Sequence, residues 1–279
     1  MCYDTLTIKK LKYFLEEKVM KKFLCIALAV VLTLGMVAAF AACSKDKGGE
    51  TTAAATTETK ETLVMATNAE FPPYEFHEGD KIVGIDAEIA QAIADKLGME
   101  LKIEDVQFDS IIPGVQAKKY DMGMAGMTVT DERKESVNFS DSYAKGVQVV
   151  IIKEDSDIKS IKDLEGKKIG VQTSTTGDIY ATDDFGEENI TKFDNGAMAT
   201  QALVAGKVDC VIIDNEPAKN YVKANAGLKI LETSYVEEDY AICFNKENTE
   251  LMNKVNGALK ELIADGTVKS IVDKYIKAD

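Results

Sequence analysis

The sequence predicts an α/β fold, because short apolar segments alternate with helical segments from Thr62 onward. A second observation is an internal similarity between QAKKYDMGMAGMT at 116–128 and QALVAGKVDCVIID at 201–214. Each stretch reads, in order, as the end of a helix, a Lys-x-Asp motif and a strand. Such a similarity can arise by chance in an α/β chain, whereas a real repeat predicts two similar lobes. It then places Thr128 and Asp214 at the carboxyl ends of corresponding strands, where ligands bind in open α/β sheets.

The elements of the first part of the chain have clear boundaries. TLVMAT, which begins at Thr62, predicts a strand, and in the helix after it apolar residues recur every four positions. That stripe comprises Ile85, Ile89, Ile93 and Leu97. We expect Asp86 to cap the amino end of this helix and Gly98 to end it. ELKIEDV then predicts a strand, Ser110 caps a helix with Pro113 in its first turn, and DMGMAGMTV predicts a further strand.

A second group of elements begins near Gly146, where GVQVVIIKED predicts a new strand. GKKIGVQTSTTGD repeats the plan of a strand and a polar turn, with Thr175, Thr176 and Gly177 just before a helix. The free N–H groups at the start of such a helix suit an anion. The chain continues through VDCVIID and the strand YAICF to amphipathic helices, whose apolar stripe needs a surface to cover. That stripe comprises Leu251, Val255, Leu259 and Leu262.

The first 61 residues differ in kind from the rest. Residues 1–42 are predicted to be an upstream extension and a signal peptide, since MKK at Met20 precedes twenty uncharged residues and a small-residue cleavage point. The apolar run is also long enough to span a bilayer as a helix. The ending AAC resembles a lipoprotein signal, in which Cys43 is acylated and begins the mature chain, although Phe40 departs from the usual small aliphatic residue. Residues 43–61 predict a flexible tether.

The composition sets several classes of function aside. A formal net charge of −14 leaves no basic surface for nucleic acid. The one histidine, His77, lies in FHEGDK, which is typical of a hairpin loop, and no zinc-ligand spacing occurs. Cys210 and Cys243 lie in apolar strands, so we expect buried thiols and no disulfide. We therefore expect no metal and no cofactor, and the residues offer little for nucleophilic catalysis.

One arginine, Arg133, stands among the 33 lysines and arginines of the chain. Its planar fork matches a carboxylate two bonds at a time, which a lysine ammonium cannot do. Asp214, at the end of VDCVIID, can hold an ammonium, and NAEFPPYEF supplies aromatic faces such as Phe71. Together these groups would recognise a free amino acid. Each also has a simpler interpretation: a stray surface arginine, an N-cap aspartate and a core phenylalanine.

Several motifs in order carry a more specific resemblance. They are ATNAEFPPYEF, GIDAEIAQAIADKLG, FDSIIPGVQAKKYDMGMAGMTVTDERKESVNFSDSY, DLEGKKIGVQTSTTG, KVDCVIID and KVNGALKELIADGT. From about Thr62 to Ile276 the chain resembles bacterial extracellular amino-acid-binding proteins of ABC importers, which are family 3 solute-binding proteins, particularly their glutamine-binding and lysine/arginine/ornithine-binding branches. The resemblance implies a periplasmic-binding-protein-like type II fold, with two α/β lobes joined by two crossing hinge strands. Lobe 1 would comprise 62–145 plus 241–279, and lobe 2 would comprise 146–240.

The resemblance also implies how the ends of an amino acid are held. Arg133 would clamp the α-carboxylate, with help from the backbone N–H groups of Thr128 and Thr176. Asp214, the Thr128 hydroxyl and the Gly126 carbonyl would hold the α-ammonium.

The ligand side chain would lie between Phe71 and Phe108. In the glutamine-binding branch an Asp stands where this chain has Asn68, and a Lys stands where it has Gln172. A cationic ligand would therefore lack its usual acid unless Glu70 supplies one. A neutral polar amino acid is the favoured ligand, and a basic one comes second.

The resemblance implies a function outside the cytoplasm. The protein would be a monomer tethered to the cell membrane by lipid on Cys43, and would deliver the amino acid to an ABC importer permease and its ATPase subunit. It would not be an enzyme. The alternative is a dehydratase of the prephenate or arogenate type on the same fold, with Glu70 as a catalytic group.

Overall fold

The computed structural model describes residues 60–277. The predicted signal peptide, the acylated Cys43 and nearly all of the tether therefore lie outside the described residues. The described part contains two mixed sheets and a small antiparallel sheet. The α/β prediction is confirmed.

The first sheet, which with its helices we call lobe 1, takes strands from both ends of the described part. Its strands lie in the order β5-β1-β6-β14-β7. β1 pairs in parallel with β5 and β6, whereas β14 is antiparallel to β6 and β7. The bounds are β1 Thr62–Thr67, β5 Glu100–Asp105, β6 Met122–Gly123, β7 Val137–Phe139 and β14 Cys243–Asn245.

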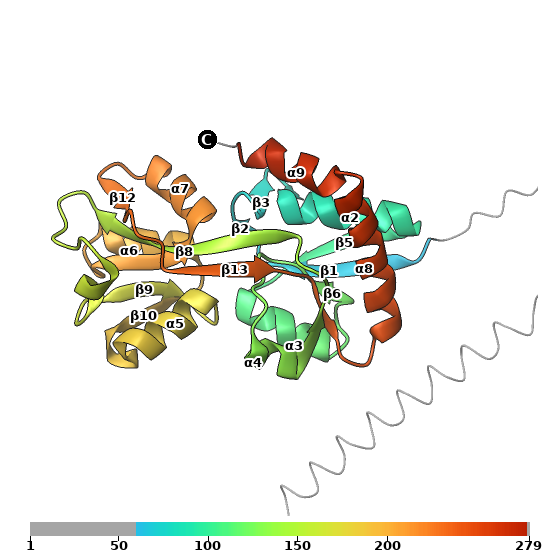
Figure 1. Cartoon of the computed structure of the whole chain (residues 1–279), viewed down its shortest axis with the longest axis horizontal. Coiled ribbons are helices and arrows are strands. Elements are labelled where there is room, and N and C mark those ends of the chain that lie inside the picture. Colours follow the sequence, from blue (N-terminus) through green and yellow to red (C-terminus); the bar gives the residue numbers. More distant parts are fainter. Residues whose placement is uncertain (1–59, 278–279) are drawn as a thin grey trace, which may run out of the picture. The chain divides into compact units, whose positions relative to one another are not determined.

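Helices cover both faces of this sheet (Figure 1). Side chains alternate along β1, so Leu63 and Met65 pack in the same apolar cluster as α2 and α8, whereas Ala66 packs in the cluster that contains α3. The bounds are α2 Ile85–Leu97, α3 Ile111–Gln116, α4 Asp131–Ser136, α8 Thr249–Ala264 and α9 Thr267–Tyr275.

A hairpin sheet lies between β1 and α2 in the sequence. It consists of β2 Glu70–Phe71, β3 Glu75–Glu78 and β4 Lys81–Val83, in the order β2-β3-β4. The hairpin was predicted around His77, but His77 itself lies on β3, with Nε2 2.8 Å from Asp105 Oδ2.

The second sheet, which with its helices we call lobe 2, has the order β10-β9-β11-β8-β12, and β13 also pairs with β8. α5 packs in the apolar cluster on one face, and α6 and α7 pack in the cluster on the other. The strands are β8 Ala144–Lys153, β9 Ile169–Gln172, β10 Ile190–Phe193, β11 Cys210–Asp214, β12 Leu228–Ile230 and β13 Val236–Tyr240. The helices are α5 Thr176–Phe185, α6 Gly196–Val204 and α7 Asn215–Ala224.

The two sheets share one topology. β1, β5 and β6 are parallel, and β14 joins β6 antiparallel. β9, β10 and β11 repeat that arrangement, with β8 antiparallel to β11. β6 and β11 are therefore equivalent strands, as the similarity between 116–128 and 201–214 predicts.

Two antiparallel strands run from one sheet to the other. β8 pairs with β13 from Ala144 opposite Tyr240 onward, and Figure 1 shows this pair crossing between the lobes. The pairing continues toward lobe 1, since Tyr143 N donates to Tyr240 O at 3.0 Å and Ser140 N donates to Ile242 O at 2.9 Å. The predicted pair of crossing strands is present. The residue at which each lobe begins stays a prediction, because both strands belong to both sides.

Some local predictions were wrong. Asp86 does not cap α2: the N-cap position is Gly84, where a Cβ would lie 2.2 Å from Tyr74 O, so only glycine fits. Ser110 occupies the N-cap position of α3 but makes no capping bond, and its hydroxyl donates to Asp109 Oδ1 instead. YAICF is two strands, because Tyr240 ends β13 and Cys243 begins β14. By contrast, Gly98 ends α2 in the left-handed conformation as predicted.

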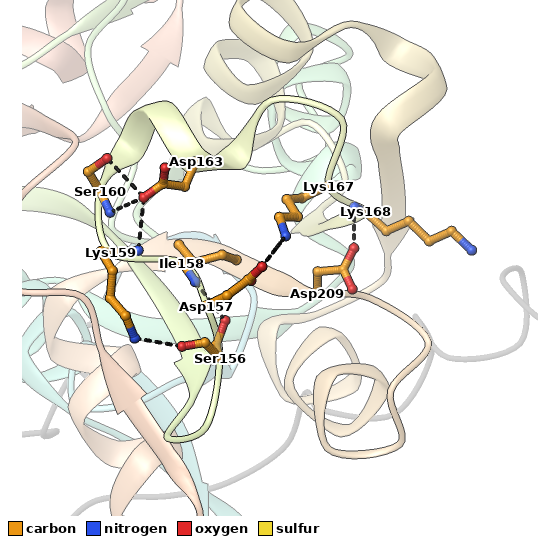
Figure 2. A network of polar contacts seen from close by, with 9 residues as sticks. All are labelled: Ser156, Asp157, Ile158, Lys159, Ser160, Asp163, Lys167, Lys168 and Asp209. Atoms are coloured by element: carbon orange, nitrogen blue, oxygen red, sulfur yellow. Dashed lines mark hydrogen bonds and ion pairs between the residues drawn. The ribbon is translucent and has the colours of Figure 1, made fainter.

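A polar network fixes the segment between β8 and β9 (Figure 2). Ser160 and Asp163 form a capping box at the start of a short 3-10 helix. Lys167 Nζ lies 3.0 Å from Asp157 Oδ1, and Lys168 N donates to Asp209 Oδ2 at 2.8 Å. These contacts join the segment to the residue that precedes β11.

Both cysteines of the described part are buried and free, as predicted. Burial raises the pKa of Cys210 and of Cys243 to about 12, so both stay protonated thiols near neutral pH. Within 60–277, no helix combines the length and the apolar character that crossing a membrane requires.

Candidate functional site

A small cavity lies between lobe 1 and lobe 2. The residues that line it follow the carboxyl ends of strands. Asn68 follows β1 and Thr128 follows β6, whereas Gln172 ends β9 and Asp214 ends β11. The equivalent strands of the two lobes therefore face one another across the cavity.

Nine predicted site residues line this cavity. They are Asn68, Phe71, Phe108, Gly126, Thr128, Arg133, Gln172, Thr176 and Asp214.

Glu70, the tenth predicted residue, lies outside the cavity. Neighbouring residues of a strand point to opposite faces, so Phe71 turns inward and Glu70 turns out. The Glu70 carboxylate accepts a hydrogen bond from Asn195 Nδ2 at 2.8 Å, and its backbone carbonyl accepts one from Tyr221 Oη at 2.9 Å. Glu70 therefore links lobe 1 to lobe 2 and does not line the cavity.

Arg133 lies in the first turn of α4, where its backbone N–H donates to the N-cap Thr130. Its side chain is 7% exposed, so the interpretation as a stray surface residue is wrong. Nη1 donates to Thr128 O at 2.8 Å, and Nη2 donates to Ser174 O of lobe 2 at 3.0 Å. The guanidinium lies 5.4 Å from the centre of the Phe108 ring. Since a guanidinium has five N–H donors, several remain for a ligand.

Asp214 ends β11 and is 1% exposed. It occupies the N-cap position of α7 but makes no capping bond, so the interpretation as a plain N-cap is wrong. Tyr240 Oη donates to Oδ2, whereas Oδ1 has no hydrogen-bond partner among the described residues. Burial raises the pKa of Asp214 to about 7, and the hydrogen bond from Tyr240 opposes the rise.

Gly126 takes a left-handed conformation with φ +51°. A Cβ at this position would lie 2.9 Å from the Phe71 ring, so glycine is needed for the ring to approach. The Gly126 N–H donates to Asp86 Oδ2 at 2.8 Å, and Tyr143 Oη donates to the same oxygen at 2.8 Å. Asp86 therefore holds the peptide group on the amino side of Gly126, next to the carbonyl that is predicted to meet the ammonium.

A second carboxyl group, Glu75, lines the cavity without exposure to solvent. Burial and the nearby Asp86 raise the pKa of Glu75 well above its usual range. Burial also raises the pKa of Asp86 to about 6, and the bonds from Gly126 and Tyr143 oppose that rise. Both oxygens of Glu75 lack a hydrogen-bond partner among the described residues, and the raised pKa favours the protonated form of this side chain.

The amide side chains meet across the lobes. Gln172 Nε2 donates to Asn68 Oδ1 at 2.9 Å, and Asn68 Nδ2 donates to Val106 O at 3.1 Å. Phe71, three residues after Asn68, packs against apolar clusters of both lobes. The phenylalanine therefore serves the core and the cavity together.

Residues 63–278 match the model of the bacterial extracellular solute-binding proteins, family 3. The chain belongs to this family.

Three relatives of this family 3 protein are informative. The arginine-binding extracellular protein ArtP of Bacillus subtilis is 34% identical over 265 residues, which cover 93% of this chain and all of ArtP. The arginine-, lysine-, histidine-binding protein ArtJ of Geobacillus stearothermophilus is 38% identical, with a TM-score of 0.75 and coverage of 78% of this chain and 96% of ArtJ. An ancestral arginine-binding protein bound to glutamine is 42% identical, with a TM-score of 0.75 and coverage of 78% and 99%. The type II periplasmic-binding-protein-like fold is thus shown, and the family supports solute binding outside the cytoplasm.

Several site residues of this family 3 protein were not predicted from the sequence. Glu75, Gln148 and Tyr240 line the cavity, and Glu238 lies directly behind Thr128. One signal in the sequence could have indicated Tyr240: Gly146 lies within a strand, and a glycine in a strand often marks a place where another group approaches the backbone closely. A Cβ there would lie 2.5 Å from Tyr240 Oη and 2.7 Å from Asp214 Oδ2. No comparable signal marks Glu238.

The described residues contain no group of three His, Cys, Asp or Glu side chains placed to hold a metal ion. The chemistry that the cavity offers is polar recognition. A guanidinium with free donors, a carboxylate with an unpaired oxygen and aromatic rings all line one small space.

Proposed function

We propose that this family 3 protein captures a free polar L-amino acid between its closing lobes and delivers it to an ABC importer. One observation carries the proposal: a buried guanidinium, Arg133, and a buried carboxylate, Asp214, line the same cavity. A zwitterion supplies the two complementary charges at one carbon atom. The names of ArtP and ArtJ, which refer to amino acids, support this class of ligand.

The carboxylate end is assigned to Arg133. The bonds to Thr128 O and Ser174 O hold the guanidinium from both lobes and leave other donors free for a bidentate contact. Thr176 begins α5, a ten-residue helix whose first N–H groups have no partner within the helix. These N–H groups and that of Thr128 can add to the binding of the same anion.

The ammonium end is assigned to Asp214 Oδ1, the Gly126 carbonyl and the Thr128 hydroxyl. An unpaired carboxylate oxygen at a buried site is costly, and an ammonium with three donors offsets that cost.

For the ligand side chain we favour a neutral polar group, with a basic group second. Asn68 and Gln172 are uncharged and bonded to one another, and the acid that a cationic side chain would need is not supplied by Glu70. The ancestral relative bound to glutamine agrees with a neutral ligand, whereas the names of ArtP and ArtJ keep basic amino acids in second place.

Contacts between the lobes support closure around the ligand. Arg133 reaches Ser174, Gln172 reaches Asn68, and Glu70 reaches Asn195. A ligand that contacts both lobes stabilises the closed arrangement relative to an open one. We take lobe 1 as 62–145 plus 241–279 and lobe 2 as 146–240.

The proposed function also includes attachment to the cell membrane and an importer as partner. Lipid on Cys43 and the tether at 43–61 would hold a monomer at the outer face of the cell membrane. The partner would be an importer permease with its ATPase subunit.

A thermal-shift screen of the twenty amino acids with ornithine and cystine tests the proposal. A ligand that binds only the folded protein adds about 2.7 kcal/mol at a hundred times its dissociation constant. We expect a shift with one polar amino acid or a small group of them. Asp214→Asn should remove the shift, whereas Asp209→Asn, which changes a carboxylate outside the cavity, should keep it. No shift with any member of the panel contradicts the proposed function.

A further inference from the structure

Glu238 is a buried carboxylate beside the cavity that the proposed function does not use. It lies on the crossing strand β13, is 6% exposed, and does not itself line the cavity. Its Oε2 accepts hydrogen bonds from Thr128 Oγ1 at 3.0 Å and from Gln148 Nε2 at 3.0 Å. Thr128 and Gln148 both line the cavity. One carboxylate thus sets the orientation of two cavity side chains.

The bond to Glu238 fixes which way the Thr128 hydroxyl points. A hydroxyl has one proton and two lone pairs, whereas a carboxylate can only accept. The Thr128 proton is therefore directed at Glu238. Thr176 Oγ1 lies 3.4 Å from Thr128 Oγ1 and can then only be the donor of that contact. The Thr128 hydroxyl can therefore act toward a ligand only as a hydrogen-bond acceptor, through its remaining lone pair.

The Gln148 amide is likewise oriented by its bond to Glu238. One N–H of Nε2 donates to Glu238, which fixes the orientation of the amide, and Oε1 at the other corner of the amide has no partner among the described residues. Gly177 leaves room for it, since a Cβ there would lie 3.0 Å from Gln148 Oε1. Asp214 Oδ1 is likewise an acceptor without a partner.

We propose that Glu238 is a positioning residue that makes this part of the cavity a set of acceptors and thereby selects an α-ammonium over an α-hydroxyl. The proposal rests on the proposed function, because it requires an α-amino acid in the cavity. An ammonium brings three donors and no acceptor, whereas a hydroxyl brings one donor and its own lone pairs. Lone pairs that face the fixed acceptors disfavour the hydroxy acid.

The test is calorimetric titration with L-glutamine and with its α-hydroxy acid counterpart, and L-arginine and its counterpart form a second pair. The quantity compared is the ratio of the two dissociation constants. Glu238→Met has similar length and no acceptor, so the preference for the amino acid should fall about tenfold or more. Glu238→Gln should stay within about threefold of the parent, since its amide oxygen can accept both bonds. Glu237→Gln is the matched control, an exposed carboxylate on the same strand, and should change nothing.

A purely structural role for Glu238 would weaken both ligands equally and leave the ratio unchanged, and that result overturns the proposal. Circular dichroism checks that each variant is folded. If Glu238→Met does not fold, Glu238→Asp, whose shorter side chain cannot reach both donors, should lower the ratio at least about threefold. A parent protein that binds no amino acid of the screen contradicts the proposed function itself, whereas binding with an unchanged ratio in the variants contradicts only the role of Glu238.

Discussion

Arg133→Lys keeps the positive charge at the centre of the site but should weaken amino-acid binding about ten- to hundredfold. The guanidinium already donates to Thr128 O and Ser174 O and still has donors for a bidentate contact with the carboxylate. A lysine ammonium has three donors from a single atom. If two of them replace the bonds to the carbonyl groups, one is left for the ligand.

The magnitude follows from the bond that is lost. A hydrogen bond to a charged group contributes about 1.5–3 kcal/mol. At about 1.4 kcal/mol for each factor of ten, that loss corresponds to one to two decades in the dissociation constant. The buried position of Arg133 keeps this contact from being screened by solvent, which distinguishes it from an exposed ion pair.

The assay is calorimetric titration of the parent and of Arg133→Lys with the amino acid found by the screen. Lys134→Arg is the matched control, because Lys134 is exposed on the same short helix and pairs with Asp131. We expect the control to bind like the parent. If folded Arg133→Lys also binds within about twofold of the parent, the carboxylate assignment is wrong.

Three further predictions concern charge and processing. Burial raises the pKa of Asp214 to about 7, and only the ionised carboxylate attracts an ammonium, so the affinity for the amino acid should fall about fivefold from pH 7 to pH 6. Asp214→Asn should bind weakly, with an affinity that does not change over this pH range. A pH-independent affinity of the parent protein would contradict the prediction. Gln172→Lys should disturb the bond to Asn68 and change the order of preference among amino acids in the thermal-shift screen more than it changes stability; an unchanged order argues against a role in specificity. Cys43→Ser should yield an unprocessed precursor or a released protein in membrane fractionation, whereas unchanged processing and attachment would exclude lipid on Cys43.

The sequence predicted the large features of the fold because their signals are local and repeated. The apolar stripe from Ile85 to Leu97 gives α2, and the similarity between 116–128 and 201–214 reflects equivalent strands in the two sheets. Residues at the ends of such strands were predicted to meet, and Thr128 and Asp214 do line one cavity.

What the sequence did not predict depends on contacts between distant segments. Asp86 looked like a helix cap by its place before an apolar stripe, yet its carboxylate is needed 40 residues away at Gly126. Glu70 and Phe71 point to opposite faces of β2, and which of the two faces the cavity depends on how β2 pairs with β3. Glu238 shows no pattern along β13, and its role emerges from two side chains that reach it from other strands and loops.

The central claim is that the cavity recognises both charged ends of a free amino acid. Calorimetric titration of the parent protein with the amino acid found by the screen, with its α-carboxamide and with its des-amino acid tests this claim most directly. The carboxamide lacks the partner of Arg133, and the des-amino acid lacks the partner of Asp214. Each loss removes a charge-assisted contact of about 1.5–3 kcal/mol, so we expect each analogue to bind about ten- to hundredfold more weakly than the amino acid. An analogue that binds as tightly as the amino acid would contradict the claim for the end that it lacks.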